Sequence, residues 1–162
     1  MLRVVHYGDS QIELDRISSN LRSFFQGKFG GGGPGMLPIV QPVPTATVRQ
    51  WATENFSAYT SYGIGNRDEN GYGIMGKYYR ISGDGSCSFS GTRANRVRLL
   101  LNDRKGDFTA VLKIKDIDYA DTVHADSATG FKILEWHLPS TVSDFKLHFS
   151  GTADLHGVMV DN

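Results

Sequence analysis

The chain has 162 residues, of which seventeen are basic and seventeen acidic, so it carries no formal net charge. This balance argues against a general binder of nucleic acid or of anionic membranes, because such proteins carry a basic excess. A single cysteine, Cys87, excludes an intrachain disulfide framework and a cysteine-based zinc cluster, and we interpret it as a small buried apolar residue. Nineteen glycines, more than the typical ~7%, indicate many turns and hence a β-rich chain.

The first zone is expected to hold a strand and a helix, residues 1–29. Residues 2–7 form a short apolar run that predicts a buried strand. Apolar residues then recur at helical spacing and predict an amphipathic helix over residues 13–28. These residues are Leu14, Ile17, Leu21, Phe24 and Phe25. Asp9 and Ser10 stand where an N-cap belongs, and the glycines from residue 30 on are expected to end the helix.

Residues 30–47 are predicted to be a linker between domains. The segment begins Gly-Gly-Gly-Gly-Pro-Gly and contains four of the five prolines, so it can form neither a helix nor a central strand. The glycine run is not expected to be a phosphate-binding loop, because it follows a helix and precedes prolines.

Residues 48–156 predict a succession of short strands. Apolar side chains alternate with polar ones in 95–101, 107–115, 129–138 and 142–150, and turn residues separate these runs. Such spacing is typical of an antiparallel β-sandwich, here of jelly-roll type. Trp136 alternates with Leu134 and Leu138, so we expect it in the core. Residues 157–162 end the chain with a short buried strand over Val158–Val160.

Gly8-Asp9-Ser10 is the sharpest local motif. A strand that ends at Ser10, with a helix directly behind it, would place a hydroxyl near the positive end of the helix dipole. Backbone N–H groups there would stabilise negative charge developing on a substrate oxygen. Serine is a weak nucleophile until a base takes its proton, and the motif itself offers no base. A helix cap without catalysis is the alternative interpretation of Ser10.

The motif and its surroundings resemble the first sequence block of the SGNH/GDSL hydrolases, a family of esterases and acylhydrolases. The run from Gly8 through Gln11-Ile12-Glu13 to Gly33-Pro34-Gly35 is similar to a bacterial subset that carries an inserted β-sandwich, as in the peptidoglycan O-acetylesterases. Gln11 stands where the family usually has Leu, which the subset tolerates. The resemblance covers about the first 47 residues and the last six, which look like a return strand towards the hydrolase core.

By that resemblance, Ser10 is the nucleophile and its backbone N–H an oxyanion donor, with Gly8 and Asp9 in supporting positions. The family takes its other oxyanion donors and its base from later blocks, so the chain looks like an N-terminal fragment that is inactive alone. Asp121 and His124 have the spacing of the catalytic Asp-x-x-His, but they fall inside the sandwich and are expected to be surface residues. No cofactor is implied, and the resemblance suggests an extracytoplasmic location.

The sandwich offers a second function, carbohydrate binding. Several aromatic residues could stack on sugars or fill the core: Trp51, Tyr59, Tyr62, Tyr72, Tyr78, Tyr79 and Trp136. Of these, Tyr72, Tyr78 and Tyr79 are the predicted surface candidates. The five histidines have no metal-site spacing, so no metal is expected.

The sequence therefore predicts a strand and helix of an incomplete α/β hydrolase core, followed by a β-sandwich. Its predicted function is that of part of a serine esterase acting on an acetylated glycan, with acyl-enzyme formation on Ser10. The alternatives are a carbohydrate-binding module without catalysis and a structural piece that awaits a partner chain. The apolar stripe of the helix 13–28 is expected to dock on the sandwich, to pair with another copy, to be poorly ordered, or to meet the missing hydrolase core.

Overall fold

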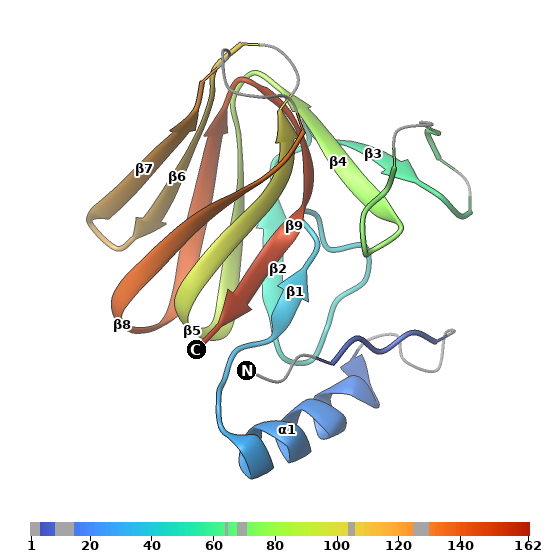
Figure 1. The fold of residues 1–162 in the computed structure, drawn as a ribbon, viewed down its shortest axis with the longest axis vertical. Helices are drawn as coiled ribbons and strands as arrows, with labels where there is room; N and C mark the ends of the chain where they lie inside the picture. The colour runs from blue at the N-terminus through green and yellow to red at the C-terminus, as the bar shows by residue number, and fades with distance from the viewer. Residues whose placement is uncertain (1–3, 9–14, 64, 68–70, 104–105, 125–129) are drawn as a thin grey trace.

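The computed structural model describes residues 4–8, 15–63, 65–67, 71–103, 106–124 and 130–162. In these residues the protein is mainly β, with one helix and nine antiparallel strands in one sheet (Figure 1). The elements are α1 (Ser18–Phe29), β1 (Gly35–Leu37), β2 (Arg49–Ala52), β3 (Ser57–Thr60), β4 (Lys77–Ser82), β5 (Gly85–Asp103), β6 (Phe108–Ile114), β7 (Ile117–Val123), β8 (Phe131–Ser150) and β9 (Thr152–Asp161). The predicted antiparallel β-sandwich is confirmed.

The sheet curls so that its two halves face each other across the core. Its order is β3-β4-β9-β5-β8-β6-β7, with β1 added to β9 and β2 to β5. β5 and β8 are long enough to run through both halves, and their pairing shifts register between Ser90 and Arg96. We call β1, β3, β4 and β9, with residues 96–103 of β5 and 131–138 of β8, the first half-sheet. The second half-sheet is β2, β6 and β7 with residues 85–90 of β5 and 144–150 of β8.

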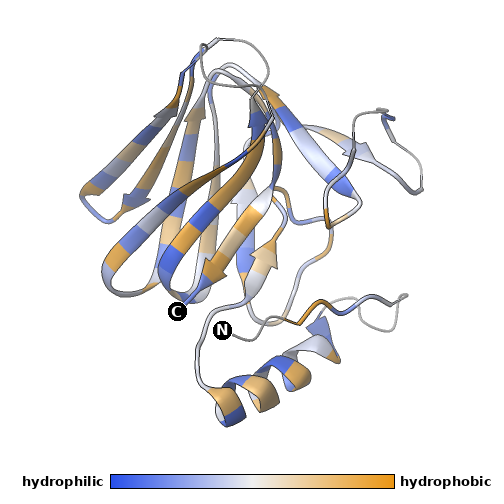
Figure 2. Ribbon diagram, in the orientation of Figure 1, coloured by the Kyte–Doolittle hydropathy of each residue, from blue (hydrophilic) through white to orange (hydrophobic). Residues whose placement is uncertain are grey.

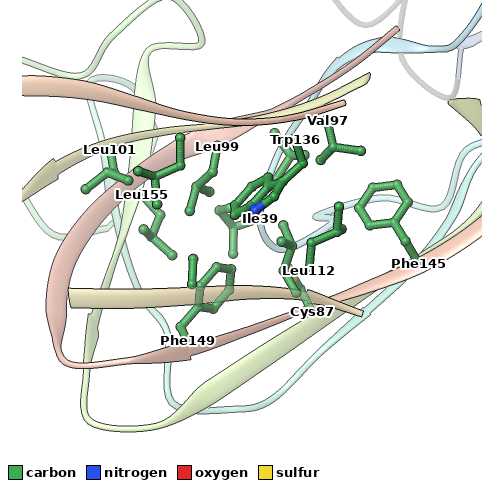
Figure 3. Packing of buried hydrophobic residues seen from close by; sticks show 14 of the residues in the cluster. Ile39, Cys87, Val97, Leu99, Leu101, Leu112, Trp136, Phe145, Phe149 and Leu155 are labelled. Carbon is green, nitrogen blue, oxygen red and sulfur yellow. The ribbon is translucent and has the colours of Figure 1, made fainter. Parts of the chain in front are cut away.

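The core lies between the two half-sheets, and the alternation in the sequence predicts which side chains fill it. Figure 3 shows Leu99 and Trp136 on one layer facing Leu112 and Phe149 on the other. Trp136 is buried, as predicted. Cys87 is also buried, and this burial raises the pKa of its thiol. Figure 2 shows the same alternation as apolar and polar bands along the strands.

The predicted N-terminal strand is wrong for the residues that the structure describes. Residues 4–8 have no regular secondary structure and are exposed, because no described strand offers them a hydrogen-bonding partner. The Tyr7 hydroxyl donates to the carbonyl of Ile74 at 3.5 Å, so this segment lies beside the loop that precedes β4.

The helix is confirmed, but it begins at Ser18 and not near Glu13. Asp15 has a φ of 63°, which a helix does not allow, and its carboxylate accepts two hydrogen bonds from Arg22, both at 2.8 Å. The Thr47 hydroxyl donates to the same carboxylate at 2.7 Å. The helix ends as predicted, since Gly30 follows its last residue with a φ of 77°. The expected cap residues, Asp9 and Ser10, lie outside the described residues.

The predicted linker and return strand are both joined to the sandwich. Gly35–Leu37 pairs with β9, and Ile39 is fully buried in the core. β1 pairs on one side only, so its place at an edge agrees with the local prolines. The expected boundary between residues 156 and 157 falls inside β9, and Val158 and Val160 lie in the sandwich core. The domain limits themselves stay a prediction.

Among the described residues, no helix combines the length and the apolar character that a membrane crossing requires.

Candidate functional site

The predicted nucleophile lies in a part of the chain that the structure does not describe. Ser10 and Asp9 are outside the described residues, and their role stays a prediction. Gly8, the last described residue before them, is exposed and outside any helix or strand. Asp121 and His124 lie at the end of β7 and are exposed, as expected for surface residues. His124 Nδ1 lies 3.5 Å from Asp107 Oδ2.

The prediction that Tyr78 and Tyr79 lie on the surface is wrong. Both are on β4, where successive side chains point to opposite faces, and their exposed fractions are only 2% and 6%. Tyr79 points into the core and donates its hydroxyl to the carbonyl of Val40 at 2.9 Å. Burial raises the pKa of Tyr79 to about 12. Neither ring is free to stack on a sugar.

Tyr78 lies on the outer face of the first half-sheet, inside a cluster of aromatic and charged side chains. Its ring stacks on Tyr59 with a centroid distance of 4.9 Å, and Tyr72 covers it from the preceding loop at 6.0 Å. Tyr72 is half-buried and is the one predicted surface tyrosine that keeps some exposure. The structure thus brings Tyr72 and Tyr78 together and sends Tyr79 to the other side of the sheet.

Arg80 and Asp154 hold the charged part of this cluster together. The Arg80 guanidinium donates to both carboxylate oxygens of Asp154, at 2.7 and 3.2 Å. It also lies 4.3 Å from the centroid of the Tyr59 ring. A two-point ion pair beneath an aromatic ring is a stable arrangement for a buried charge. Its role is therefore to fix β4 against β9.

His156 completes the cluster. It is the buried residue of the cluster whose imidazole could in principle act as a base. Its ring lies 5.5 Å from both Tyr78 and Phe131, and a side chain on Gly73 would meet its Nδ1 at 2.8 Å. Neither ring nitrogen makes a well-aligned hydrogen bond among the described residues. Burial lowers the pKa of His156, although the Tyr72 backbone and Asp154 act in the opposite direction. A neutral ring covered on all sides can fill space, but an ester in solution cannot reach it.

A groove on the opposite side of the molecule was not predicted from the sequence. It has a volume of about 480 Å³, is open to solvent and lies on the outer face of the second half-sheet. The lining residues are Thr53, Asp84, Gly85, Ser86, Thr109, Val111, His148, Phe149 and Ser150. These residues come from four strands and their ends, so no local sequence pattern predicts the groove.

Trp51 and Lys146 lie one row of paired residues beyond this groove. Trp51 pairs with Ser88, which pairs with Lys146 in turn, so their side chains lie on one face. The indole is 58% exposed, and Lys146 Nζ lies 5.8 Å from its ring centroid. An exposed indole on a sheet is a flat apolar platform, which the outward position of residue 51 in β2 creates.

The described residues contain no group of three or more His, Cys, Asp or Glu side chains that could hold a metal ion. His137 and His148 are both on β8 but eleven residues apart, and His156 on β9 is enclosed by aromatic rings.

Comparison with known proteins gives structural likeness only. No family model and no curated protein matches the sequence. A solved structure of a peptidoglycan O-acetylesterase is similar, with a TM-score of 0.69 and 20% identity. The likeness covers 96% of this chain and 41% of that one, so the chain spans about two fifths of its length.

Two carbohydrate-binding modules are also similar, more distantly. One, described as CBM61 in complex with β-1,4-galactotriose, has a TM-score of 0.39 at 10% identity, over 72% of this chain and 86% of its own. A family 29 module has a TM-score of 0.45 at 10% identity, over 81% of this chain and 85% of its own. At these identities the likenesses concern the fold, and the chain therefore shares the β-rich fold of part of a peptidoglycan O-acetylesterase.

Proposed function

We propose that this chain supplies the nucleophile and the accompanying β-sandwich of a serine esterase that removes acetyl groups from a glycan. The observation that carries the proposal is the likeness of 96% of the chain to 41% of a peptidoglycan O-acetylesterase. The Gly8-Asp9-Ser10 motif supports it independently, because the motif and the sandwich follow one another as they do in the SGNH subset.

The chemistry would be acyl transfer through an acyl-enzyme on Ser10. The Ser10 hydroxyl oxygen attacks the acetyl carbonyl carbon, and its proton passes to a base. The tetrahedral intermediate carries its negative charge on the former carbonyl oxygen, which backbone N–H groups stabilise. The C–O bond to the sugar then breaks, and the sugar oxygen takes the proton. Water hydrolyses the acetyl-serine and releases acetate.

The base and two of the oxyanion donors would come from parts of the enzyme outside these 162 residues. In the SGNH pattern the base belongs to an Asp-x-x-His near the C-terminus, whereas Asp121 lies in β7 of the sandwich and His124 directly follows that strand. Nucleophile, base and oxyanion donors act as a unit, so the chain alone is expected to be inert.

Exposed apolar side chains at the N-terminal end support a larger assembly. Val4 and Val5 are more than half exposed, and α1 contains no buried residue. Figure 1 places α1 below the sandwich, and Figure 2 shows its apolar positions. The apolar face of α1 is therefore not buried against the sandwich in this structure. We propose that the remaining hydrolase core covers it, with self-association through residues 13–28 as the alternative.

A glycan of the cell wall as substrate would place the enzyme outside the cytoplasm, so we propose an extracytoplasmic location. This rests on the nature of the substrate and on the named likeness to a peptidoglycan O-acetylesterase.

The test is acetate release from O-acetylated peptidoglycan by the full-length product of the gene. The Ser10→Ala variant should lose at least about a hundredfold in rate, since the nucleophile is removed. Ser23→Ala, which changes an exposed serine of α1, should leave the rate unchanged. Equal rates for the Ser10→Ala variant and the unchanged enzyme would overturn the proposal. Robust Ser10-dependent hydrolysis by the 162-residue chain alone would instead overturn the expectation that the chain is inert without the other blocks.

A carbohydrate-binding module without catalysis is the second candidate. The open groove and the exposed Trp51 favour it, since a glycan can lie across such a face. Glycan binding that persists in Ser10→Ala, without acetate release by any form of the protein, is the result that would select it.

A further inference from the structure

The outer face of the second half-sheet carries a row of side chains beside the groove. Trp51, Ser88, Lys146 and Lys113 are paired in succession across β2, β5, β8 and β6. The next row towards the groove contains Ser86, His148 and Val111, which are paired in the same way. Since alternate residues in a strand are about 7 Å apart, an extended ligand in the groove would reach the indole of Trp51.

The chemistry of the two rows differs. The groove is lined by the His148 imidazole and by the hydroxyls of Thr53, Ser86 and Thr109. Ser86 is buried, and the other two hydroxyls also bond to Asn55 and Thr122, so the imidazole and the remaining lone pairs of these oxygens are what a sugar hydroxyl could meet. Trp51 offers a flat apolar surface that matches the C–H face of a pyranose ring. This combination of a stacking platform and several small polar groups fits a carbohydrate better than it fits an apolar ligand.

Lys146 favours a ligand that carries a negative charge near Trp51. Lys113 forms an ion pair with Asp118 at 2.7 Å, whereas Lys146 has no carboxylate within ion-pair distance among the described residues. Asp84 lies at the far end of the groove, and Asp144 lies two residues before Lys146 on the strand. A lysine beside an exposed indole can bind an anionic group on a ring that stacks there.

The two lysines also act on His148, whose side chain lines the groove. Burial, then Lys146 and Lys113, lower the pKa of His148, and Asp118 only partly opposes them. Lys146 and Lys113 therefore both lie close enough to the imidazole to disfavour its protonation.

We propose that this face binds a glycan that carries carboxylates, with one sugar ring stacked on Trp51 and its carboxylate at Lys146 Nζ. The inference deepens the proposed function, because both concern a glycan. It can be tested on the 162-residue chain without any ester cleavage, so its failure and that of the esterase proposal are distinguishable.

The experiment measures binding of the chain to polygalacturonate, hyaluronan and alginate, with highly methyl-esterified pectin as the uncharged counterpart of the first. We expect binding to at least one acidic polymer, weaker binding to the ester, and a loss of affinity as salt rises. Trp51→Ala and Lys146→Ala should each weaken binding at least tenfold. The conservative variants Trp51→Phe and Lys146→Arg should keep part of the affinity that the alanine variants lose.

Matched controls are available on the same chain. Tyr62→Ala removes a ring that is as exposed as Trp51, at 58% each, and Lys28→Ala removes a surface charge on α1. Both should bind like the unchanged chain, and unfolding midpoints should confirm that all variants are folded. Binding to none of the acidic polymers, or binding that survives both Trp51→Ala and Lys146→Ala, would overturn the proposal. Equal binding to polygalacturonate and its methyl ester would overturn the role of the carboxylate.

Discussion

At the scale of single residues, the aromatic side chains show what alternation can and cannot predict. Apolar residues flank Trp136 at a period of two, which predicts a core position, and Trp136 is buried. Tyr78 and Tyr79 stand between polar residues and were expected at the surface. Both are buried, because Tyr79 faces the core while Tyr59 and Tyr72 cover Tyr78 on the other side. Burial by residues that are distant in the sequence cannot be predicted from the pattern of neighbouring residues.

His156 predicts a pH dependence of stability. Its pKa is lowered by burial, so the folded protein binds fewer protons there than the unfolded chain, whose imidazole titrates near ~6.5. The neutral imidazole therefore contributes to the free energy of unfolding above pH ~6.5. This contribution is lost as the pH falls through ~6.5 towards the pKa of the folded state, by at most about 1.4 kcal/mol per pH unit.

The measurement is the free energy of unfolding in urea between pH 8 and pH 5. His156→Phe, which keeps a ring in the same space, should flatten the slope in this range. His6→Phe changes an exposed histidine and should leave the slope as it is. An unaltered slope in His156→Phe would show that other groups cause the acid sensitivity.

At the scale of elements, the sequence predicts which segments form strands or helices better than it predicts where these elements begin and end. The alternation in 129–138 and 142–150 predicts two extended runs, and the structure joins residues 131–150 into one strand, β8, that passes through both half-sheets. The helix begins five residues later than its apolar spacing predicts, because Asp15 adopts a non-helical φ to bind Arg22 and Thr47. Tertiary contacts such as these override local preference.

Gly157 marks an irregularity in β9 that no side chain fits. Its φ is 147°, and a Cβ there would lie 2.8 Å from the carbonyl oxygen of Leu37 on β1. Gly157→Ala should therefore lower the free energy of unfolding by about 2 kcal/mol. Gly27→Ala, in α1 with nothing within 4 Å of the added carbon, should not lower it. Urea titrations of both variants decide the matter, and equal stabilities would refute the packing argument.

At the scale of the whole molecule, the sandwich could be predicted from the sequence and the groove on its second half-sheet could not. Regular alternation and turn residues specify a sheet with one buried face, which is a local property of each strand. The groove joins residues from position 53 to position 150, and in the sequence Trp51 is one aromatic residue among several. The SGNH interpretation of the N-terminus came from a short motif, and the described residues neither include Ser10 nor form the expected strand before it.

The central claim is that Ser10 is a nucleophile, and covalent labelling tests it most directly. The full-length product of the gene would be treated with a fluorophosphonate, which reacts with activated serines, and its peptides analysed by mass spectrometry. The account predicts one phosphonylated peptide, modified at Ser10, and no labelling after Ser10→Ala. A protein that remains unlabelled, or one labelled at another serine while Ser10 stays unmodified, would contradict it.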